Sequence, residues 1–246
     1  MLNKCLKELR SLAMQPIAAT KQDWTSARLA LLEREKAHTR ERDALAAARR
    51  ALPAWKLEKD YKFDGPDGTE SLRDLFGPHS QLMVYHFMFG TDWDEGCTSC
   101  SFWGDNLDGI DIHLAHRDIS FVMVSTALYP KLKAYQDRMG WRFKWLSCAG
   151  SDFNRDMQVS FTPEDIEAGC HSYNFRQQGF NGPEAPGLTA FRRDGDAILH
   201  TYGTFGRGLD AFNGAYQLLD LAPKGRDEDD LPWGMAWLRR HDQYDD

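Results

Sequence analysis

Two cysteines lie three positions apart in the stretch GCTSCSFWGD, residues 96–105. A Cys-x-x-Cys pair can exchange a disulfide, supply two ligands to zinc, or have no chemical role. On a helix, residues three apart have Cβ atoms about 5–6 Å from each other, which allows a reversible disulfide after a small adjustment. Redox chemistry at Cys97 and Cys100 is therefore the favoured interpretation, and the other two remain open.

The place of the pair predicts a different role for each thiol. If Cys97 caps the helix, the unpaired amide groups at the helix N-terminus stabilise its thiolate, so we expect Cys97 to attack the substrate. We expect Cys100, one turn deeper, to keep a higher pKa and to resolve the mixed disulfide. Asp92, Asp94 and Glu95 oppose a thiolate, but we expect these carboxylates to be exposed and screened by solvent.

The residues around the cysteines narrow the chemistry. Neither Thr98 nor Ser99 is a cation, unlike the dipeptides of strongly oxidising dithiol proteins, and this predicts a reductant or a moderate isomerase. Trp93, Phe102 and Trp103 flank the pair, and their rings either bind a protein substrate or belong to the core. The loop position of Trp93 favours substrate binding for that residue.

A zinc site at the pair would need further ligands. Structural zinc takes four, and the chain has a single C-x-x-C. Cys148, Cys170 or His171 would have to converge on the pair, and Cys148, at a strand end, is more simply a buried small residue. Cys170 with His171 is an alternative thiol site in a loop. The sequence thus predicts no bound metal and no cofactor.

The composition is that of an ordinary globular protein, with 42% hydrophobic and 27% charged residues among 246. A net charge of -7 argues against a nucleic-acid partner, which requires clustered Lys and Arg. Apolar runs such as LMVYHFMF are far shorter than the roughly 20 residues that cross a bilayer. Five irregularly spaced cysteines and the absence of a signal-like start predict a cytoplasmic protein without a membrane partner.

The chain is expected to have four parts. Residues 1–20 form a poorly defined N-terminus, and residues 21–52 form a helical arm that contains no Gly or Pro. The charged middle of this arm places it on the surface or against a partner, so a homodimer through the helix is an alternative to a peripheral docked helix. Residues 53–222 form the main domain, and the charged tail 223–246 is expected to return over it.

The main domain alternates strands and helices. Buried strands are predicted at 81–90 and 118–127, a helix at 129–140, and a third strand at 141–149. The segment 101–116, directly after the cysteines, also has a helical pattern. Such alternation with right-handed crossovers produces a parallel core sheet.

The second half of the main domain begins with an insertion. Residues 149–187 are rich in Gly, Pro, Asn and Asp and contain one predicted short helix that begins at Pro163. Two strands around Asp194-Gly195 then form a predicted hairpin, which a helix at 208–221 follows.

The order of these elements is that of the thioredoxin fold, with C-x-x-C at the end of the first core strand. More closely, the blocks HFMFGTDWDEGCTSCSFWGDNLDG, LTAFRRDGDAILHTYGTFGRGLD, LLDLAPKGR and WLRRHDQY resemble the bacterial domain-of-unknown-function family eight-nine-nine over about residues 22–243. Its members are described as predicted dithiol-disulfide oxidoreductases. The resemblance implies an α/β, thioredoxin-like three-layer sandwich in its peroxiredoxin-like variant, with a long N-terminal helix. It also implies a protein or small-molecule thiol/disulfide substrate.

Two departures from thioredoxin relatives bear on the site. Those relatives carry a cis-proline, which shapes the substrate groove, three residues ahead of the apolar residue that matches Phe191. Leu188 stands there and is assigned to substrate binding, while the nearest proline, Pro186, is two residues further back. Peroxiredoxins place Thr three and Pro seven residues before the reactive cysteine, where this chain has Asp94 and Gly90. Standard peroxidase chemistry is therefore disfavoured.

A thioredoxin-like binding module is the rival interpretation. Such a scaffold would dock a partner while its thiols stay idle. Capture of a disulfide by Cys97 in a variant that lacks Cys100 separates the two alternatives.

Overall fold

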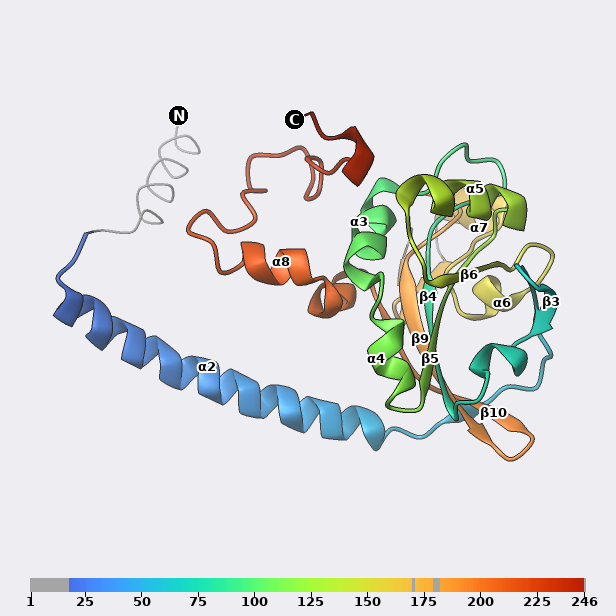
Figure 1. Cartoon of the computed structure of the whole chain (residues 1–246), viewed down its shortest axis with the longest axis horizontal. Coiled ribbons are helices and arrows are strands. Elements are labelled where there is room, and N and C mark those ends of the chain that lie inside the picture. The colour runs from blue at the N-terminus through green and yellow to red at the C-terminus, as the bar shows by residue number, and fades with distance from the viewer. Residues whose placement is uncertain (1–17, 170, 179–181, 246) are drawn as a thin grey trace. The chain divides into compact units, whose positions relative to one another are not determined.

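The computed structural model describes residues 18–169, 171–178 and 182–245 (Figure 1). The chain divides into two compact units. The core unit consists of Pro53–Ala215 together with Glu228–Asp246. The other unit comprises the chain up to Leu52 together with Tyr216–Asp227. Each unit is described by itself below.

The core unit contains an eight-stranded sheet in the order β1-β10-β9-β4-β5-β6-β2-β3. Strands β4, β5 and β6 are parallel, whereas β9 runs antiparallel to β4 and to β10. The bounds are β1 Trp55–Lys56, β2 Lys62–Gly65, β3 Gly68–Ser71, β4 Gln81–His86, β5 Ile119–Ser125, β6 Lys144–Ser147, β9 Gly187–Asp194 and β10 Ala197–Phe205.

The parallel strands are linked by helices, as the sequence predicts. Helices α3 (Thr98–Leu107) and α4 (Asp111–Ala115) connect β4 to β5, and α5 (Tyr129–Met139) connects β5 to β6. Right-handed crossovers in the same direction place these helices on one face of the sheet. The hydroxyl groups of Ser101 in α3 and Tyr135 in α5 lie 2.9 Å apart, which agrees with that placement.

Two glycine-bearing segments decide where these helices end. Gly140 adopts φ of +67° and caps α5, as expected from its place after the helical pattern. The continuous helix expected over 101–116 is interrupted at Asp108 and Gly109. Asp108 is extended and Gly109 has φ of +84°, so the chain leaves the helical conformation there.

The opposite face of the sheet carries an extensive apolar cluster. Leu82 and Val84 of β4 belong to it, together with Phe153 from α6 (Phe153–Asp156). Phe153 is fully buried and makes edge contacts with Phe63, at 4.9 Å between ring centroids. The sheet is thus the middle layer of three, although α6 and irregular chain supply less helix than the facing layer (Figure 1).

This topology is the thioredoxin-like fold in its peroxiredoxin-like variant. A βαβαβ unit supplies the parallel strands β4, β5 and β6, and the hairpin β9-β10 adds to β4 in the antiparallel sense. The predicted fold class is confirmed. Strand β4 is shorter than the apolar run that predicted it, because the chain leaves the sheet after His86 and leads to the cysteines, and β6 is also shorter than its predicted range.

The insertion contains more structure than the sequence indicated. The predicted helix exists as α7 (Pro163–Ala168), with a capping box between Thr162 and Asp165. A short hairpin, β7 (His171–Tyr173) and β8 (Arg176–Gln178), follows it. The Tyr173 hydroxyl donates to the carbonyl of Pro186 at 2.8 Å, which ties this hairpin to the start of β9.

The segment after the β9-β10 hairpin is not the continuous helix that was predicted over 208–221. It consists of a 3-10 helix, η2 (Gly206–Phe212), and a short α-helix, α8 (Gly214–Leu219). Asn213 separates them in an extended conformation. Glycine and asparagine have low helix propensity, which explains the break.

The second unit contains α2 (Lys21–Arg50), which confirms the predicted long helix. The Thr20 hydroxyl caps it by accepting from the Asp23 amide at 3.2 Å. No residue of α2 is buried, and Trp24 and Leu45 are exposed. The homodimer contact expected for this helix stays a prediction. Across the described residues, no helix combines the length and apolar character needed to span a bilayer.

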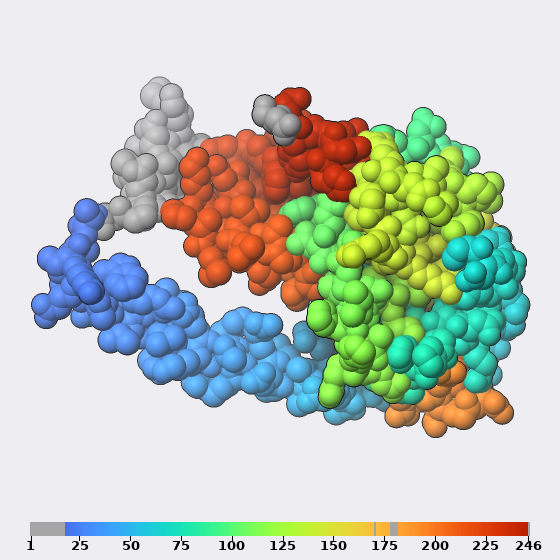
Figure 2. All heavy atoms as spheres, viewed as in Figure 1, coloured from blue at the N-terminus to red at the C-terminus, as the bar shows by residue number. Residues whose placement is uncertain are grey.

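The C-terminal residues belong to the core unit. Figure 2 shows them in red against the yellow-green surface formed around α5. Leu238 is buried, and the Trp237 indole donates to Glu228 at 2.7 Å. The charged tail therefore returns to the body of the domain from Glu228 onward.

Replacing Phe153 with alanine tests the apolar cluster beneath the sheet. The cavity left by a buried Phe costs about 3–5 kcal/mol, so Phe153→Ala should lower the free energy of unfolding by that amount in urea titrations followed by tryptophan fluorescence. Ile112→Ala, at an exposed position of α4, should change it by no more than about 0.5 kcal/mol. Equal stabilities of the two variants would contradict the layer arrangement.

Candidate active site

The loop after β4 delivers Cys97 to the start of α3. The Cys97 amide donates to the Met88 carbonyl at 3.0 Å, and the Cys97 carbonyl accepts the first helical hydrogen bond from the Ser101 amide at 2.9 Å. Cys97 is the N-cap residue, with φ of -53° and ψ of 131°. The side chain is partly exposed, whereas Cys100 is buried in the core. Both cysteines are free thiols in this structure.

The surroundings of Cys97 favour its thiolate. The Cys100 thiol, which donates to the Cys97 sulfur, is the largest influence that lowers the pKa of Cys97 to about 7. Burial opposes this shift, while the amide groups of Cys100 and Ser99 and the positive charge of Arg240 add to it. The amide groups at the N-terminus of α3 thus contribute to the stabilisation of the sulfur anion, after the larger contribution of the Cys100 thiol.

Cys100 has the opposite character. Burial raises the pKa of Cys100 well above its usual range, and the adjacent Cys97 raises it further. The Met88 amide donates to the Cys100 sulfur at 3.4 Å, so the sulfur already has one donor for a future anion. The two thiols thus differ in both exposure and acidity.

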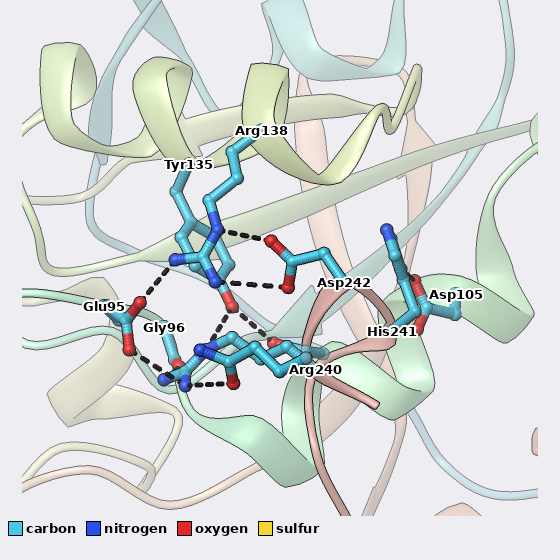
Figure 3. Close-up of polar contacts among 10 residues, drawn as sticks. Glu95, Gly96, Asp105, Tyr135, Arg138, Arg240, His241 and Asp242 are labelled. Carbon is cyan, nitrogen blue, oxygen red and sulfur yellow. Dashed lines mark hydrogen bonds and ion pairs between the residues drawn. The ribbon is translucent and has the colours of Figure 1, made fainter. Parts of the chain in front are cut away.

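The acidic residues before Cys97 do not all behave as expected. Asp92 and Asp94 are exposed, in agreement with the prediction. Glu95 is instead partly buried and forms ion pairs with Arg138 and, at 2.8 Å, with Arg240 (Figure 3). Two guanidinium groups therefore neutralise the carboxylate of Glu95, which of the three lies closest to Cys97 in the sequence.

The tryptophans that were expected to bind substrate lie in different environments. Trp103 is only 5% exposed, and its indole donates to the Leu209 carbonyl at 3.0 Å. The structure therefore gives Trp103 a role in the core in place of substrate binding. Trp93 keeps a partly exposed ring, which lies against Gly90 in the loop before the cysteines.

Leu188 lies in β9 directly opposite Tyr85 of β4. Paired residues of an antiparallel ladder point to the same face, so Leu188 shares the face that carries Tyr85. Tyr85 is fully buried beside Cys100, and this burial raises the pKa of its hydroxyl. Leu188 is therefore on the side of the sheet where the cysteines lie, with 9% of its surface exposed. No peptide bond among the described residues is cis, including those next to Pro186.

The other candidate ligands and thiols are separate from the pair. Cys148 is buried and its thiol donates to the Ser125 carbonyl at 3.3 Å, and burial raises its pKa far above the usual value. The His171 ring stacks on Phe161, with 3.8 Å between centroids. Cys170 lies outside the described residues. Within the part of the chain that the structure describes, no three His, Cys, Asp or Glu side chains gather as a metal site.

Two residues of this site were not identified from the sequence, Arg240 and Tyr135. Arg240 lies in the block WLRRHDQY, which carried part of the family resemblance but had no assigned role. Its guanidinium reaches the Gly96 carbonyl at 2.8 Å. The adjacent arginines Arg239 and Arg240 in this block were the feature of the sequence that could have indicated a role.

The model of the family described as bacterial protein of unknown function (DUF899) matches residues 13–244. The chain belongs to this family. The matched region includes the cysteine pair and the C-terminal Arg240. A comparison with curated proteins finds no match.

Several solved structures resemble this DUF899 chain. A mutant of PrxQ from Xylella fastidiosa shares 9% identity, with 68% of this chain and 96% of that chain covered and a TM-score of 0.42. The bacterioferritin comigratory protein of Xanthomonas campestris shares 14%, with coverages of 63% and 85% and a TM-score of 0.41. A putative thiol:disulfide interchange protein DsbE from Chlorobium tepidum shares 15%, with coverages of 71% and 100% and a TM-score of 0.39. Likenesses this distant say nothing about the reaction of this chain.

Alkylation of Cys97 tests the electrostatics of the site. Iodoacetamide reacts with the thiolate, so the rate at Cys97, followed by mass spectrometry of its peptide, should rise with pH around a midpoint near 7. In urea the midpoint should move up to about 8.5, since the helix amides and neighbouring groups are then lost. The same midpoint in folded and unfolded protein would contradict the proposed stabilisation.

Proposed function

We propose that the protein is a thiol-disulfide oxidoreductase that cycles Cys97 and Cys100 between dithiol and disulfide. One observation carries this proposal. A partly exposed, acidic thiol at a helix N-cap lies one turn from a buried thiol of raised pKa. The first property suits an attacking nucleophile, and the second suits a resolving thiol that stays protonated until it is needed.

The reaction proceeds in two exchanges. The Cys97 thiolate attacks one sulfur of the substrate disulfide, which breaks the substrate S–S bond, forms a mixed disulfide and releases one substrate thiolate that takes a proton. Cys100 then loses its proton, and its thiolate attacks the Cys97 sulfur. The second substrate thiolate leaves and is protonated, and a Cys97–Cys100 disulfide forms. Two electrons have passed from the protein dithiol to the substrate.

The electrostatics of the pair explain why the second exchange follows the first. In the dithiol form, the hydrogen bond with Cys97 and the negative charge on its sulfur hold the pKa of Cys100 high, in addition to burial. Once the Cys97 sulfur is in a mixed disulfide, it carries no charge, so this part of the shift disappears. The Met88 amide remains in place to stabilise the Cys100 thiolate. Formation of the mixed disulfide therefore activates the resolving thiol.

The substrate in this proposal is a protein or small-molecule disulfide, which the protein reduces or isomerises. Trp93 supplies a partly exposed ring in the approach to Cys97, and Leu188 supplies an apolar group from the neighbouring strand. The absence of a cation between the cysteines supports a reducing role. Asp94 and Gly90, at the positions where peroxiredoxins have Thr and Pro, argue against peroxide as substrate.

Cysteine variants test the mechanism directly. Cys100→Ser removes the resolving thiol. Incubation with oxidised glutathione, or with insulin that retains its native disulfides, should therefore leave a stable mixed disulfide at Cys97, visible by intact mass spectrometry. Cys97→Ser should form no such adduct at Cys100, because that thiol is buried. Cys148→Ser, remote from the pair in its contacts, should retain turnover. A folded Cys100→Ser variant that captures neither disulfide would favour an idle binding module.

The redox potential tests the direction of the reaction. A nucleophilic thiol with a pKa near 7 resembles that of thioredoxin, so the dithiol should equilibrate with glutathione at a potential closer to about -270 mV than to about -120 mV. A value near the oxidising end would contradict the reducing role while leaving dithiol chemistry intact. The potential is measured from the fraction of Cys97–Cys100 disulfide over a range of glutathione ratios.

A further inference from the structure

Arg240 of the C-terminal segment reaches the residue that precedes the nucleophilic thiol. Its Nη2 group donates to the Gly96 carbonyl at 2.8 Å, and its Nε group donates to the Tyr135 hydroxyl at 2.8 Å (Figure 3). A third contact is the ion pair with Glu95 at 2.8 Å. One planar guanidinium therefore holds three groups in a fixed geometry, which a lysine could not reproduce.

A directed chain of hydrogen bonds continues from Arg240 to the other side of Cys97. The Ser101 hydroxyl lies 2.9 Å from the Cys97 carbonyl, and a carbonyl only accepts, so the Ser101 proton is used there. The Ser101 oxygen must then accept from the Tyr135 hydroxyl, 2.9 Å away. Tyr135 in turn accepts from Arg240, which only donates. The donors thus run from Arg240 through Tyr135 and Ser101 to Cys97.

The peptide unit between Gly96 and Cys97 is held at both of its polar atoms. Arg240 binds its carbonyl oxygen, and the Met88 carbonyl accepts from its N–H at 3.0 Å. A side chain at Gly96 would lie within 2.9 Å of the Phe87 and Tyr135 rings, so only glycine fits beneath this peptide. The orientation of Cys97 at the helix N-terminus depends on this peptide plane.

The C-terminal segment is itself fastened to the helices beside the site. Asp242 forms a bidentate pair with Arg138 of α5, with distances of 2.7 and 3.1 Å (Figure 3). His241 lies 2.7 Å from a carboxylate oxygen of Asp105 in α3. The carboxylates of Glu95 and Asp242 thus alternate with the guanidinium groups of Arg138 and Arg240. The four formal charges cancel, which leaves the site without the excess of negative charge that would oppose a thiolate.

We propose that Arg240 is a positioning residue for Cys97, which binds the Gly96 carbonyl directly, acts on the Cys97 carbonyl through Tyr135 and Ser101, and adds a positive charge to the surroundings of the thiol. The C-terminal segment is then a component of the thiol site and not an appendage of the domain. The consequence for turnover rests on the proposed oxidoreductase function, whereas the effect on the thiol itself does not.

The groups that face Cys97 are consistent with this assignment. Cys100 comes from α3, Tyr85 from β4 and Arg240 from the C-terminal segment. Arg240 is paired with Glu95, which is also paired with Arg138. The positive charge of Arg240 is among the influences that lower the pKa of Cys97. Because Glu95 shares its charge, we expect a smaller effect than the 1–3 units typical of an unshared ion pair.

Substitution of Arg240 provides the test. In Arg240→Met, the midpoint of the pH profile for alkylation of Cys97 by iodoacetamide should rise by about half a unit or more. The redox potential should become more negative, because the reduced form loses stabilisation of its thiolate. Arg240→Lys keeps the positive charge but loses the planar guanidinium that binds three groups at once. It should therefore restore the midpoint only in part.

Two further variants separate a specific role from general damage. Arg239→Met changes the adjacent arginine, whose side chain contacts the carbonyls of Ala236 and Leu238, and should leave the profile unchanged. Tyr135→Phe removes the hydroxyl that links Arg240 to Ser101 and should raise the midpoint even if Arg240→Met does not fold. An unchanged alkylation midpoint in folded Arg240→Met would overturn the assignment. If Arg240→Met does not fold, an unchanged midpoint in Tyr135→Phe would do so. If Cys97 in the Cys100→Ser variant formed no mixed disulfide with an added disulfide, the proposed function would be overturned instead.

Discussion

The site depends on the donors that meet one sulfur at the start of α3, first the Cys100 thiol and then the amide groups of Cys100 and Ser99. The first amides of a helix have no intrahelical acceptor, and the thiolate of an N-cap cysteine can occupy that place. The sheet makes this possible, because β4 ends at His86 and the following loop returns the Cys97 amide to the Met88 carbonyl. Cys97 therefore lies at the N-cap of α3 and is partly exposed, whereas Cys100, one turn further along the helix, is buried in the core.

Burial acts in opposite ways on the two thiols. It disfavours an anion at both, but Cys97 has compensating donors and a nearby cation, whereas Cys100 has the Met88 amide and the thiolate of its neighbour. A single apolar environment thus contains two residues of the same type with unequal acidity. The proposed disulfide exchange would rely on this difference, because it needs only two sulfurs of unequal acidity.

Segments far apart in the chain complete this arrangement. Arg240 and Gly96 are separated by 144 positions, and Arg138 and Asp242 by 104. Tyr135 of α5 joins them, since it accepts from Arg240 and contacts Ser101 of α3. The charges that surround the thiol therefore come from a loop, a helix and the C-terminal segment, and each ion pair among them joins two of these segments.

Local pattern in the sequence was sufficient for the order of elements and for the place of the cysteine pair. Runs of apolar residues, helix-ending Gly140 and the strand-to-helix change at Cys97 depend on neighbours within a few positions, and these predictions are confirmed. The boundary at Asp108 and the short helix α6 were missed, because packing and backbone conformation override a weak pattern there.

The tertiary structure decided which of the flanking groups reach the thiol. Trp93 and Trp103 have the same chemistry and lie near the pair in sequence, yet Trp103 enters the core because α3 turns that face toward Leu209. Arg240 acts at Cys97 only because the C-terminal segment folds back onto the domain. The sequence by itself determined a helix-capping dithiol on a thioredoxin-like sheet. The charges that tune it became visible only in the folded chain, since contacts between distant residues follow from packing and not from spacing.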